Sequence, residues 1–340
     1  MSPARLTLAR LALAPLLALA ATPALAQEKV IFGTNWRPQA EHGGYYQAVA
    51  DGTYAACGLE VEIRPGGPQV NNRALLLAGQ IDFYMGGNLI QAFAALEQDI
   101  PFVVVAADFQ KEPQALLTHP GAVKSFEEIA GLDKLFVSDL GYQTFYRWLV
   151  SERGFAEEKR APYTFNPAPF IADPRSAQQG YVTSEPFAVE NAAGIKPDVW
   201  LLADYGFSSY SNTIETLRTT VETRPESVRC FVEGSAIGWA NFLYGDNSAG
   251  LAAIQAANPE MTEAQLAYSV QALKDYGIVD SGDAESLGIG AMTEARMAEF
   301  YAKMVAAGVL PAGLDIARAY SLAFTNNGVS LPVKARLLGQ

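Results

Sequence analysis

The chain has 340 residues, half of them hydrophobic, and carries 36 Asp and Glu against 24 Lys and Arg, a formal net charge of −12. This excess of acid argues against a nucleic acid or an anionic membrane surface as a partner. Two cysteines, Cys57 and Cys230, are too few for a disulfide scaffold but leave room for one bridge, and two histidines do not supply a conventional zinc site.

Residues 1–26 have the pattern of a secretory signal peptide. Arg5 and Arg10 precede a short apolar run, and Ala24-Leu25-Ala26 provides an A-x-A cleavage site. The apolar run is too short to anchor the chain in a bilayer. We therefore expect cleavage near Ala26 and a periplasmic mature chain that is long enough for two compact domains.

Strand and helix patterns alternate along the first two thirds of the chain. The expected strands are 30–33, 59–64, 81–85, 102–107, 135–138, 163–166, 180–184, 199–203 and 213–217, and a second strand–helix cycle begins at 114–118. The expected helices start at about residue 45 and then cover 70–78, 89–96, 126–130, 142–153, a short piece around 176, and 187–193, with mainly helices after 225. This alternation predicts an α/β fold with a largely parallel sheet.

Two crossings of the chain, near 108–113 and 204–211, predict two α/β lobes joined by a hinge, with a ligand cleft between them. Lobe 1 would comprise 27–110 and 208–340, and lobe 2 would comprise 111–207. The C-terminal helices would pack on lobe 1. The aromatic run 239–244 is interpreted as helix packing.

The stretch from Asn35 to Tyr46 turns the first strand into the first helix. Pro38 ends the strand, and Gly43-Gly44 would let the backbone pass close to whatever lies in front of the helix. Ligands of open α/β folds bind beyond the carboxyl ends of strands, so Trp36 is expected where a ligand would lie. The alternative that these aromatic residues only pack the domain stays open.

Three motifs carry a family resemblance. They are Trp36-Arg37-Pro38 with His42-Gly43-Gly44-Tyr45-Tyr46, the run 75–82 before Met85-Gly86-Gly87-Asn88, and Thr183-Ser184-Glu185-Pro186. With the signal peptide, they resemble the bacterial periplasmic substrate-binding proteins of ABC importers, in the group that binds thiamine pyrimidine precursors, nitrate, sulfonates or taurine. The resemblance covers residues 30–326. It implies a two-lobed periplasmic-binding-protein fold, a hinge, a ligand held between the lobes, delivery to an ABC permease in the inner membrane, and no catalysis.

Within that group the pyrimidine-precursor branch is most similar, because it places an acid near the ring's amino edge, a role that Glu185 fits. The anion-binding branches favour small hydroxyl residues in the loop that here reads 138–142, where Asp139 would repel a sulfonate. The leading hypothesis is therefore a binder of a small N-containing heterocycle. The alternatives are a binder of nitrate, sulfonate or taurine, and an enzyme that resembles a pyrimidine synthase.

The loops that should face the cleft supply the candidate ligand-binding residues. These are Trp36, His42, Tyr45, Gly87, Asn88, Asp108, Asp139, Tyr142, Glu185 and Asp204. Acids outnumber bases among them, which suits a ligand with N–H groups or positive charge because an unpaired buried carboxylate is costly. As alternatives, Asp108 and Asp204 would cap turns at the crossings and Glu185 would cap a helix. We expect a monomer, with no cofactor.

Overall fold

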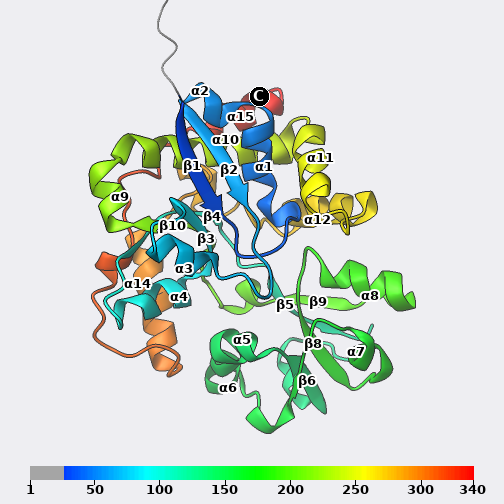
Figure 1. Cartoon of the computed structure of the whole chain (residues 1–340). Coiled ribbons are helices and arrows are strands. Elements are labelled where there is room, and N and C mark those ends of the chain that lie inside the picture. Colours follow the sequence, from blue (N-terminus) through cyan, green and yellow to red (C-terminus); the bar gives the residue numbers. More distant parts are fainter. Residues whose placement is uncertain (1–26) are drawn as a thin grey trace, which may run out of the picture.

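The computed structural model describes residues 27–340. The predicted signal peptide at 1–26 lies outside the described residues. Figure 1 shows two lobes, one above the other, each built on its own sheet with helices around it. The two-lobed α/β architecture expected from the sequence is therefore confirmed.

The sheet of the first lobe has five strands in the order β2-β1-β3-β10-β4. Their bounds are β1 (Glu28–Gly33), β2 (Leu59–Arg64), β3 (Phe83–Asn88), β4 (Phe102–Phe109) and β10 (Ser211–Leu217). Every residue of β4 is buried, as its uninterrupted apolar run predicts for a strand covered on both faces. The carboxyl ends of β1 and β3 point toward the second lobe in Figure 1, which places the residues that follow them between the lobes.

The sheet of the second lobe has the order β7-β6-β8-β5-β9. Its strands are β5 (Gln114–Thr118), β6 (Lys134–Val137), β7 (Arg160–Pro162), β8 (Ser176–Tyr181) and β9 (Asp198–Leu201). The chain enters this lobe between β4 and β5 and leaves it between β9 and β10. At the two crossings Lys111 Nζ lies 2.7 Å from Asp204 Oδ1, so an ion pair joins them.

The prediction of a largely parallel sheet is confirmed, because four of the five strands in each sheet run the same way and one runs opposite. In the first sheet β10 is antiparallel to both β3 and β4, and in the second sheet β5 is antiparallel to both β8 and β9. These are the strands next to the crossings, where the chain enters the second lobe or returns from it. Each therefore joins a sheet whose other strands run the opposite way.

Two secondary-structure elements predicted between residues 163 and 184 are wrong. The segment 163–166 is not a strand, and Ser176, expected in a short helix, begins the central strand β8. Hydropathy did not indicate this strand because two of its buried residues are glutamines. Gln179 Oε1 accepts from Ser138 N at 2.7 Å, and Gln178 Nε2 donates to the Tyr163 hydroxyl at 3.3 Å.

Fifteen α-helices are assigned between residues 27 and 340. In the first lobe, before the crossing, they are α1 (Gly43–Ala50), α2 (Thr53–Ala56), α3 (Asn72–Leu77) and α4 (Leu89–Leu96). In the second lobe they are α5 (Asp139–Gly141), α6 (Arg147–Arg153), α7 (Ala168–Ala172) and α8 (Glu185–Ala193). After the return they are α9 (Arg218–Thr223), α10 (Pro225–Tyr244), α11 (Ser248–Ala257), α12 (Glu263–Asp275), α13 (Ala284–Leu287), α14 (Glu294–Ala306) and α15 (Ser330–Leu337). As expected, the helices after α9 surround the first lobe (Figure 1).

The Gly43-Gly44 pair serves the contact between α1 and α10. A Cβ at Gly43 would lie 2.1 Å from the Phe242 ring, and one at Gly44 would lie 2.3 Å from the Trp239 ring. The backbone thus passes close to α10 and not to a ligand, which corrects the interpretation drawn from the sequence. Trp239 and Phe242 are fully buried, so the aromatic run of α10 is packing, as predicted.

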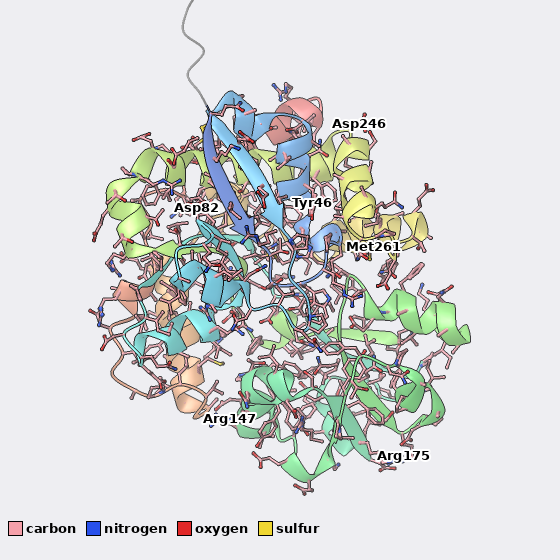
Figure 2. The ribbon with its side chains drawn as sticks, viewed as in Figure 1. Tyr46, Asp82, Arg147, Arg175, Asp246 and Met261 are labelled. Atoms are coloured by element: carbon pink, nitrogen blue, oxygen red, sulfur yellow. A yellow bond between two sulfur atoms is a disulfide. The ribbon has the colours of Figure 1, made fainter. Side chains whose placement is uncertain are left out.

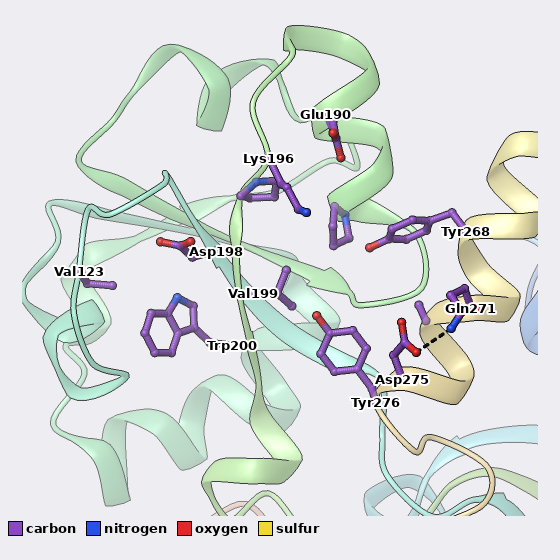
Figure 3. Close-up of a pocket in the computed structure, with 13 residues that line it drawn as sticks. Val123, Glu190, Lys196, Asp198, Val199, Trp200, Tyr268, Gln271, Asp275 and Tyr276 are labelled. Atoms are coloured by element: carbon purple, nitrogen blue, oxygen red, sulfur yellow. Dashed lines mark hydrogen bonds between the residues drawn. The ribbon is translucent and has the colours of Figure 1, made fainter.

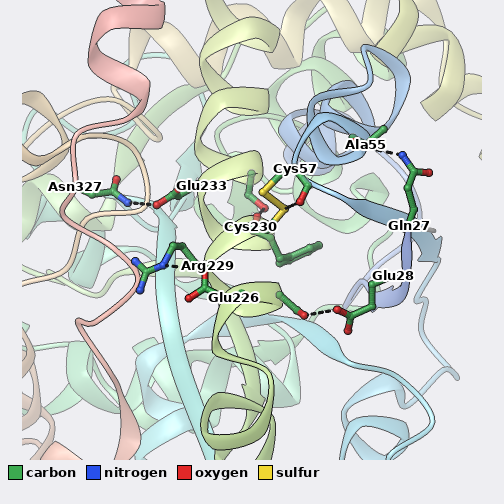
Figure 4. The surroundings of a disulfide bond; sticks show 12 residues. Gln27, Glu28, Ala55, Cys57, Glu226, Arg229, Cys230, Glu233 and Asn327 are labelled. Carbon is green, nitrogen blue, oxygen red and sulfur yellow. Dashed lines mark hydrogen bonds and ion pairs between the residues drawn. A yellow bond between two sulfur atoms is a disulfide. The ribbon is translucent and has the colours of Figure 1, made fainter. Parts of the chain in front are cut away.

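A disulfide joins Cys57, just after α2, to Cys230 in α10 (Figure 4). It closes a loop between residues 173 positions apart. Nearby, Asp82 accepts from Ile31 N at 2.8 Å and pairs with Arg224 at 2.6 Å, so it ties β1 to the start of α10 (Asp82 is labelled in Figure 2). These contacts fix the far side of the first lobe.

Candidate ligand-binding site

A cavity of about 500 Å³ lies between the lobes. From the first lobe its wall includes the segment after β1, the β3–α4 turn and the start of β10. From the second lobe it includes the β6–α5 turn, Phe165 and the β8–α8 turn. Five residues predicted from the sequence line it: Trp36, His42, Gly87, Asn88 and Glu185.

His42 belongs to a 3₁₀ turn, η1 (Ala40–His42), that follows β1 and leads into α1. Its Nδ1 accepts from Gln39 N at 3.2 Å, so the ring proton sits on Nε2. Burial lowers the pKa of His42 to about 4, which keeps the imidazole neutral at pH 7. Nε2 has no hydrogen-bond partner among residues 27–340 and is therefore free to donate to a ligand.

Asn88 ends β3 and caps α4. Its Oδ1 accepts from Ile90 N at 3.1 Å, and its Nδ2 donates to Glu112 at 3.0 Å. Glu112 is buried, and this burial raises the pKa of its carboxyl to about 7. Asn88 therefore holds one acid of the wall in place. Gly87, the preceding residue, accepts from Ser211 Oγ at 2.7 Å through its carbonyl.

Glu185 is the first residue of α8. Its carboxylate accepts from Tyr181 N and from Ser184 Oγ, both at 2.7 Å, and burial raises its pKa. Glu185 therefore lies in the cavity wall. The alternative that it caps a helix is wrong, because Ser184 is the N-cap of α8 and Glu185 accepts from Tyr181 N of β8 instead.

Glu41, one residue before His42, is a third buried acid of the wall. It accepts a hydrogen bond from Thr183 Oγ1 of the second lobe. Burial, together with the negative charge of Glu185, raises the pKa of Glu41 to about 7. Its carboxyl therefore both lines the cavity and joins the lobes.

Aromatic rings complete the wall. Trp36 from the first lobe and Phe165 from the second lie with ring centroids 5.7 Å apart, and Tyr84, Phe109 and Tyr181 also line the cavity. No lysine or arginine is among the lining residues, all of which belong to the described part of the chain. The site can thus hold a flat ring. Its polar partners are carboxyl groups, one neutral imidazole, and the amide and hydroxyl groups of neighbouring lining residues.

The other five predicted site residues lie outside this lining. Tyr45 and Asp108 are fully buried behind it: the Tyr45 hydroxyl donates to Asn212 Oδ1 at 2.6 Å, and Trp239 Nε1 donates to Asp108 Oδ2 at 3.2 Å. Asn212 itself lines the cavity, so Tyr45 supports the wall from behind.

Asp139, Tyr142 and Asp204 point elsewhere. Asp139 is exposed and pairs with Arg160, the Tyr142 hydroxyl donates to Glu157 at 3.1 Å, and Asp204 pairs with Lys111. Ser138 caps α5 by accepting from Gly141 N, and the cavity is lined from this turn by Ser138, Leu140 and Gly141. The argument that Asp139 repels an anion is therefore wrong.

Glu41, Glu112, Phe165 and Tyr181 were missed from the sequence. Glu41 stands beside His42, and Glu112 stands in the predicted crossing 108–113, so position relative to strand ends could have indicated both. Phe165 and Tyr181 fall in the region where the strands were misassigned. The sequence therefore did not predict that these two residues line the cavity.

A second cavity, of about 620 Å³, lies between α12 and the segment from α8 to β9 (Figure 3). Tyr268 and Tyr276 face Trp200 across it, with Lys196 among several acids on its rim. None of the predicted site residues lines it. None of its lining side chains is a buried polar group without a partner among the described residues. The cavity between β3, η1 and α8 is therefore the candidate site.

Residues 39–245 match the family described as NMT1/THI5 like. The chain belongs to the NMT1/THI5-like family. No curated protein matches the sequence.

Solved structures share the fold at low identity. The alkanesulfonate-binding protein SsuA from Xanthomonas axonopodis pv. citri, bound to MOPS, is 13% identical with a TM-score of 0.60, over 87% of this chain and 99% of that one. The periplasmic nitrate-binding protein NrtA from Synechocystis PCC 6803 is 11% identical with a TM-score of 0.58, over 92% and 89%. The desulfurization enzyme DSZB is 16% identical with a TM-score of 0.55, over 90% and 99%. The chain therefore has the periplasmic-binding-protein fold, a fold found mainly in binding proteins among these neighbours and also in an enzyme.

None of the helices between residues 27 and 340 combines the length and the apolarity that crossing a bilayer requires.

Proposed function

We propose that this chain is the periplasmic solute-binding component of an ABC importer, and that it delivers a small N-containing heterocycle, similar to a thiamine pyrimidine precursor, to a permease in the inner membrane. The observation that carries the proposal is the lining of the interlobe cavity: three buried or half-buried acids, aromatic rings, and no lysine or arginine. The ring of such a ligand would lie against Trp36. Its amino edge would donate to Glu185.

Near each of three helix starts that border the cavity, one backbone donor is already used within the protein. Asn88 Oδ1 accepts from Ile90 N at the start of α4, and Ser138 Oγ accepts from Gly141 N in α5. Tyr181 N, next to the start of α8, donates to the carboxylate of Glu185. An oxyanion at these helix starts would compete with internal acceptors and meet negative charge.

The second candidate is a binder of sulfonate or nitrate. The neighbours SsuA and NrtA favour it, because they are alkanesulfonate-binding and nitrate-binding proteins. A role as an enzyme is favoured only by the shared fold of DSZB.

The test is calorimetric titration of the mature protein with the aminopyrimidine precursor of thiamine and, separately, with taurine, an alkanesulfonate and nitrate. Binding of the aminopyrimidine, with weak or absent binding of the anions, supports the proposal. Preferred binding of an anion contradicts it. Recovery of unchanged ligand after incubation separates a binding protein from an enzyme.

A further inference from the structure

Three acids, Glu41, Glu112 and Glu185, line the cavity together with the phenol of Tyr181. Burial raises the pKa of this phenol, and the charges of Glu112, Glu41 and Glu185 each raise it further, so all three acids lie within electrostatic reach of the same hydroxyl. Glu41 and Glu112 are among the most buried charged residues of the chain, with 3% and 5% of their surface exposed. The cavity thus gathers three acids in its wall, two of them almost fully buried.

No cation compensates these acids within the described residues. Neighbouring bases are held elsewhere: Arg37 pairs with Glu260, Lys111 with Asp204, Arg160 with Asp139, and Arg73 with Glu215. His42, next to Glu41, is neutral for the reason given above. An empty cavity of this kind disfavours ionised carboxylates.

The groups that face each acid are few. Glu41 meets Thr183 and the charge of Glu185, and on α12, which packs against η1, the charged residues Glu263, Lys274 and Asp275 are exposed. Glu112 meets Asn88 and Tyr181. Glu185 accepts a hydrogen bond from Ser184. The pKa values of the phenols of Tyr163, Tyr181 and Tyr268 are raised mainly by burial, and the charge of Glu185 raises them further.

A second observation points to an absent ligand. His42 is 1% exposed, lines the cavity, and has an Nε2 without a partner between residues 27 and 340. Leaving such a donor unsatisfied costs free energy, which a ligand atom that accepts a hydrogen bond would recover. A ligand that suits this wall would place a hydrogen-bond acceptor toward His42, and positive charge or hydrogen-bond donors toward the acids.

We propose that the cavity takes its ligand as a cation, and that capture of this cation releases protons from Glu41 and Glu112 into the solvent. This inference rests on the proposed function and adds the charge of the ligand and the coupling to protons. In the empty cavity Glu41 and Glu112 hold their protons below about pH 7, because burial raises their pKa values to about 7. A positive charge a few ångströms away favours the carboxylate form, so each proton leaves as the ligand enters.

Glu41 would also couple the ligand to lobe closure. Its carboxyl accepts from Thr183, whose own carbonyl accepts from Ser269 Oγ of α12 at 2.6 Å. When Glu41 ionises, the bond from Thr183 becomes charge-assisted and therefore stronger. A cationic ligand thus strengthens a contact between the lobes that a neutral ligand leaves weak.

The test uses three probes of one shape: benzamidine, a planar cation across the pH range used, benzamide, its neutral counterpart, and benzoate, its anion. Calorimetry at pH 6, 7 and 8 should give benzamidine the tightest binding. Its dissociation constant should fall about tenfold between pH 6 and pH 8 for each carboxyl that loses a proton, while that of benzamide stays constant. At pH 7, titrations in two buffers of different ionisation enthalpy should show proton release with benzamidine only.

Variants locate the effect. Glu112→Gln and Glu41→Gln should each reduce the number of protons released and weaken benzamidine, with benzamide changed less than about twofold. Glu226→Gln, an exposed acid at the start of α10, is the matched control and should change nothing. If Glu41→Gln does not fold, Glu112→Gln carries the test.

The inference is overturned if benzamidine binds no more tightly than benzamide, or if it binds without releasing protons. Binding of the aminopyrimidine without any dependence on pH would overturn the inference and leave the proposed function standing. Preferred binding of a sulfonate would overturn both.

Discussion

Trp36 and Phe165 lie against each other at the lining of the interlobe cavity, one from each lobe, with ring centroids 5.7 Å apart. Phe165 is 58% exposed and has a φ of 61°, a region that residues other than glycine seldom adopt. An exposed aromatic side chain on a strained backbone contributes little to the stability of the fold. We therefore expect Phe165 to act with Trp36 on the ligand.

Replacing either ring should weaken a planar ligand. Trp36→Ala or Phe165→Ala removes one aromatic contact, worth about 0.5–1.5 kcal/mol, so affinity should fall about twofold to tenfold. The loss should depend little on ligand charge, because ring contact is lost and no ionic group changes. Titration calorimetry measures it, with Val49→Ala, an exposed residue of α1, as the control. Unchanged affinity in both ring variants would show that the pair only packs.

Glu185→Gln separates a nitrogen heterocycle from an oxyanion. The amide keeps the shape but turns a donor toward the ligand's donors, so affinity for an aminopyrimidine should fall by roughly 2–4 kcal/mol, about thirtyfold to a thousandfold. For a sulfonate or nitrate the same change removes repulsion and should leave affinity equal or higher. Asp139→Asn, outside the cavity and paired with Arg160, should bind like the parent. A Glu185→Gln protein with the parent's affinity for the aminopyrimidine removes the reason to prefer that ligand.

Ligand should draw the lobes together. Hydrogen bonds join the lobes directly; among them, Ser269 Oγ donates to the Thr183 carbonyl and Arg147 donates to the Gly308 carbonyl (Arg147 is labelled in Figure 2). X-ray scattering should show a smaller radius of gyration at saturating ligand than in the empty protein. Equal radii, with the empty protein larger than the structure described here, would argue against a hinged clamp.

The empty protein should be more stable in mild acid than at neutral pH. Burial raises the pKa of Asp108, Glu41 and Glu112 to about 7, whereas the unfolded carboxyls titrate near their ordinary values of about 4. Between these values the folded state holds more protons, so stability is greatest below about pH 4.5 for these groups and is lost as the pH rises to about 7. His42, with a pKa lowered to about 4, acts in the opposite direction between about pH 4 and 6.5, but it is one group against three.

Thermal unfolding between pH 5 and pH 8 checks this expectation. Asp108→Asn removes one titrating group that lies outside the cavity, so it should flatten the pH dependence without changing the lining. A melting temperature that rises steadily from pH 5 to pH 8 in the parent would contradict the buried, protonated state of these acids.

The disulfide should contribute measurably to stability. The bond between Cys57 and Cys230 ties α2 to α10 across a long loop, and removal of such a bond typically costs about 2–5 kcal/mol. Cys57→Ser with Cys230→Ser should lower the midpoint of urea unfolding. A thiol reductant should lower that of the parent and leave the double variant unchanged. A reductant that has no effect on the parent would show that the bond contributes nothing.

Local sequence patterns determined much of the architecture. Strand β2 has the predicted bounds 59–64, helix α4 has the predicted bounds 89–96, and β4 is buried throughout, because each pattern records burial on one or two faces directly. The motifs also placed Trp36, His42, Gly87, Asn88 and Glu185, all of which line the cavity, because each stands at the carboxyl end of a strand or in the segment that follows one. Whether they bind the ligand remains a prediction.

Only the tertiary structure decided which side chains meet. Strand β8 is central although two of its buried residues are glutamines. Gln179 accepts from Ser138 N and Gln178 donates to the Tyr163 hydroxyl, and no local hydropathy pattern records such distant partners. Asp139 and Glu41 are both acids just beyond a strand end. The helical turn that Ser138 caps leaves Asp139 exposed beside Arg160, whereas Glu41 is buried against Thr183 of the other lobe. Which acids line the cavity therefore depends on contacts such as that between Glu41 and Thr183, which are 142 positions apart in the chain. Local sequence patterns do not record such contacts.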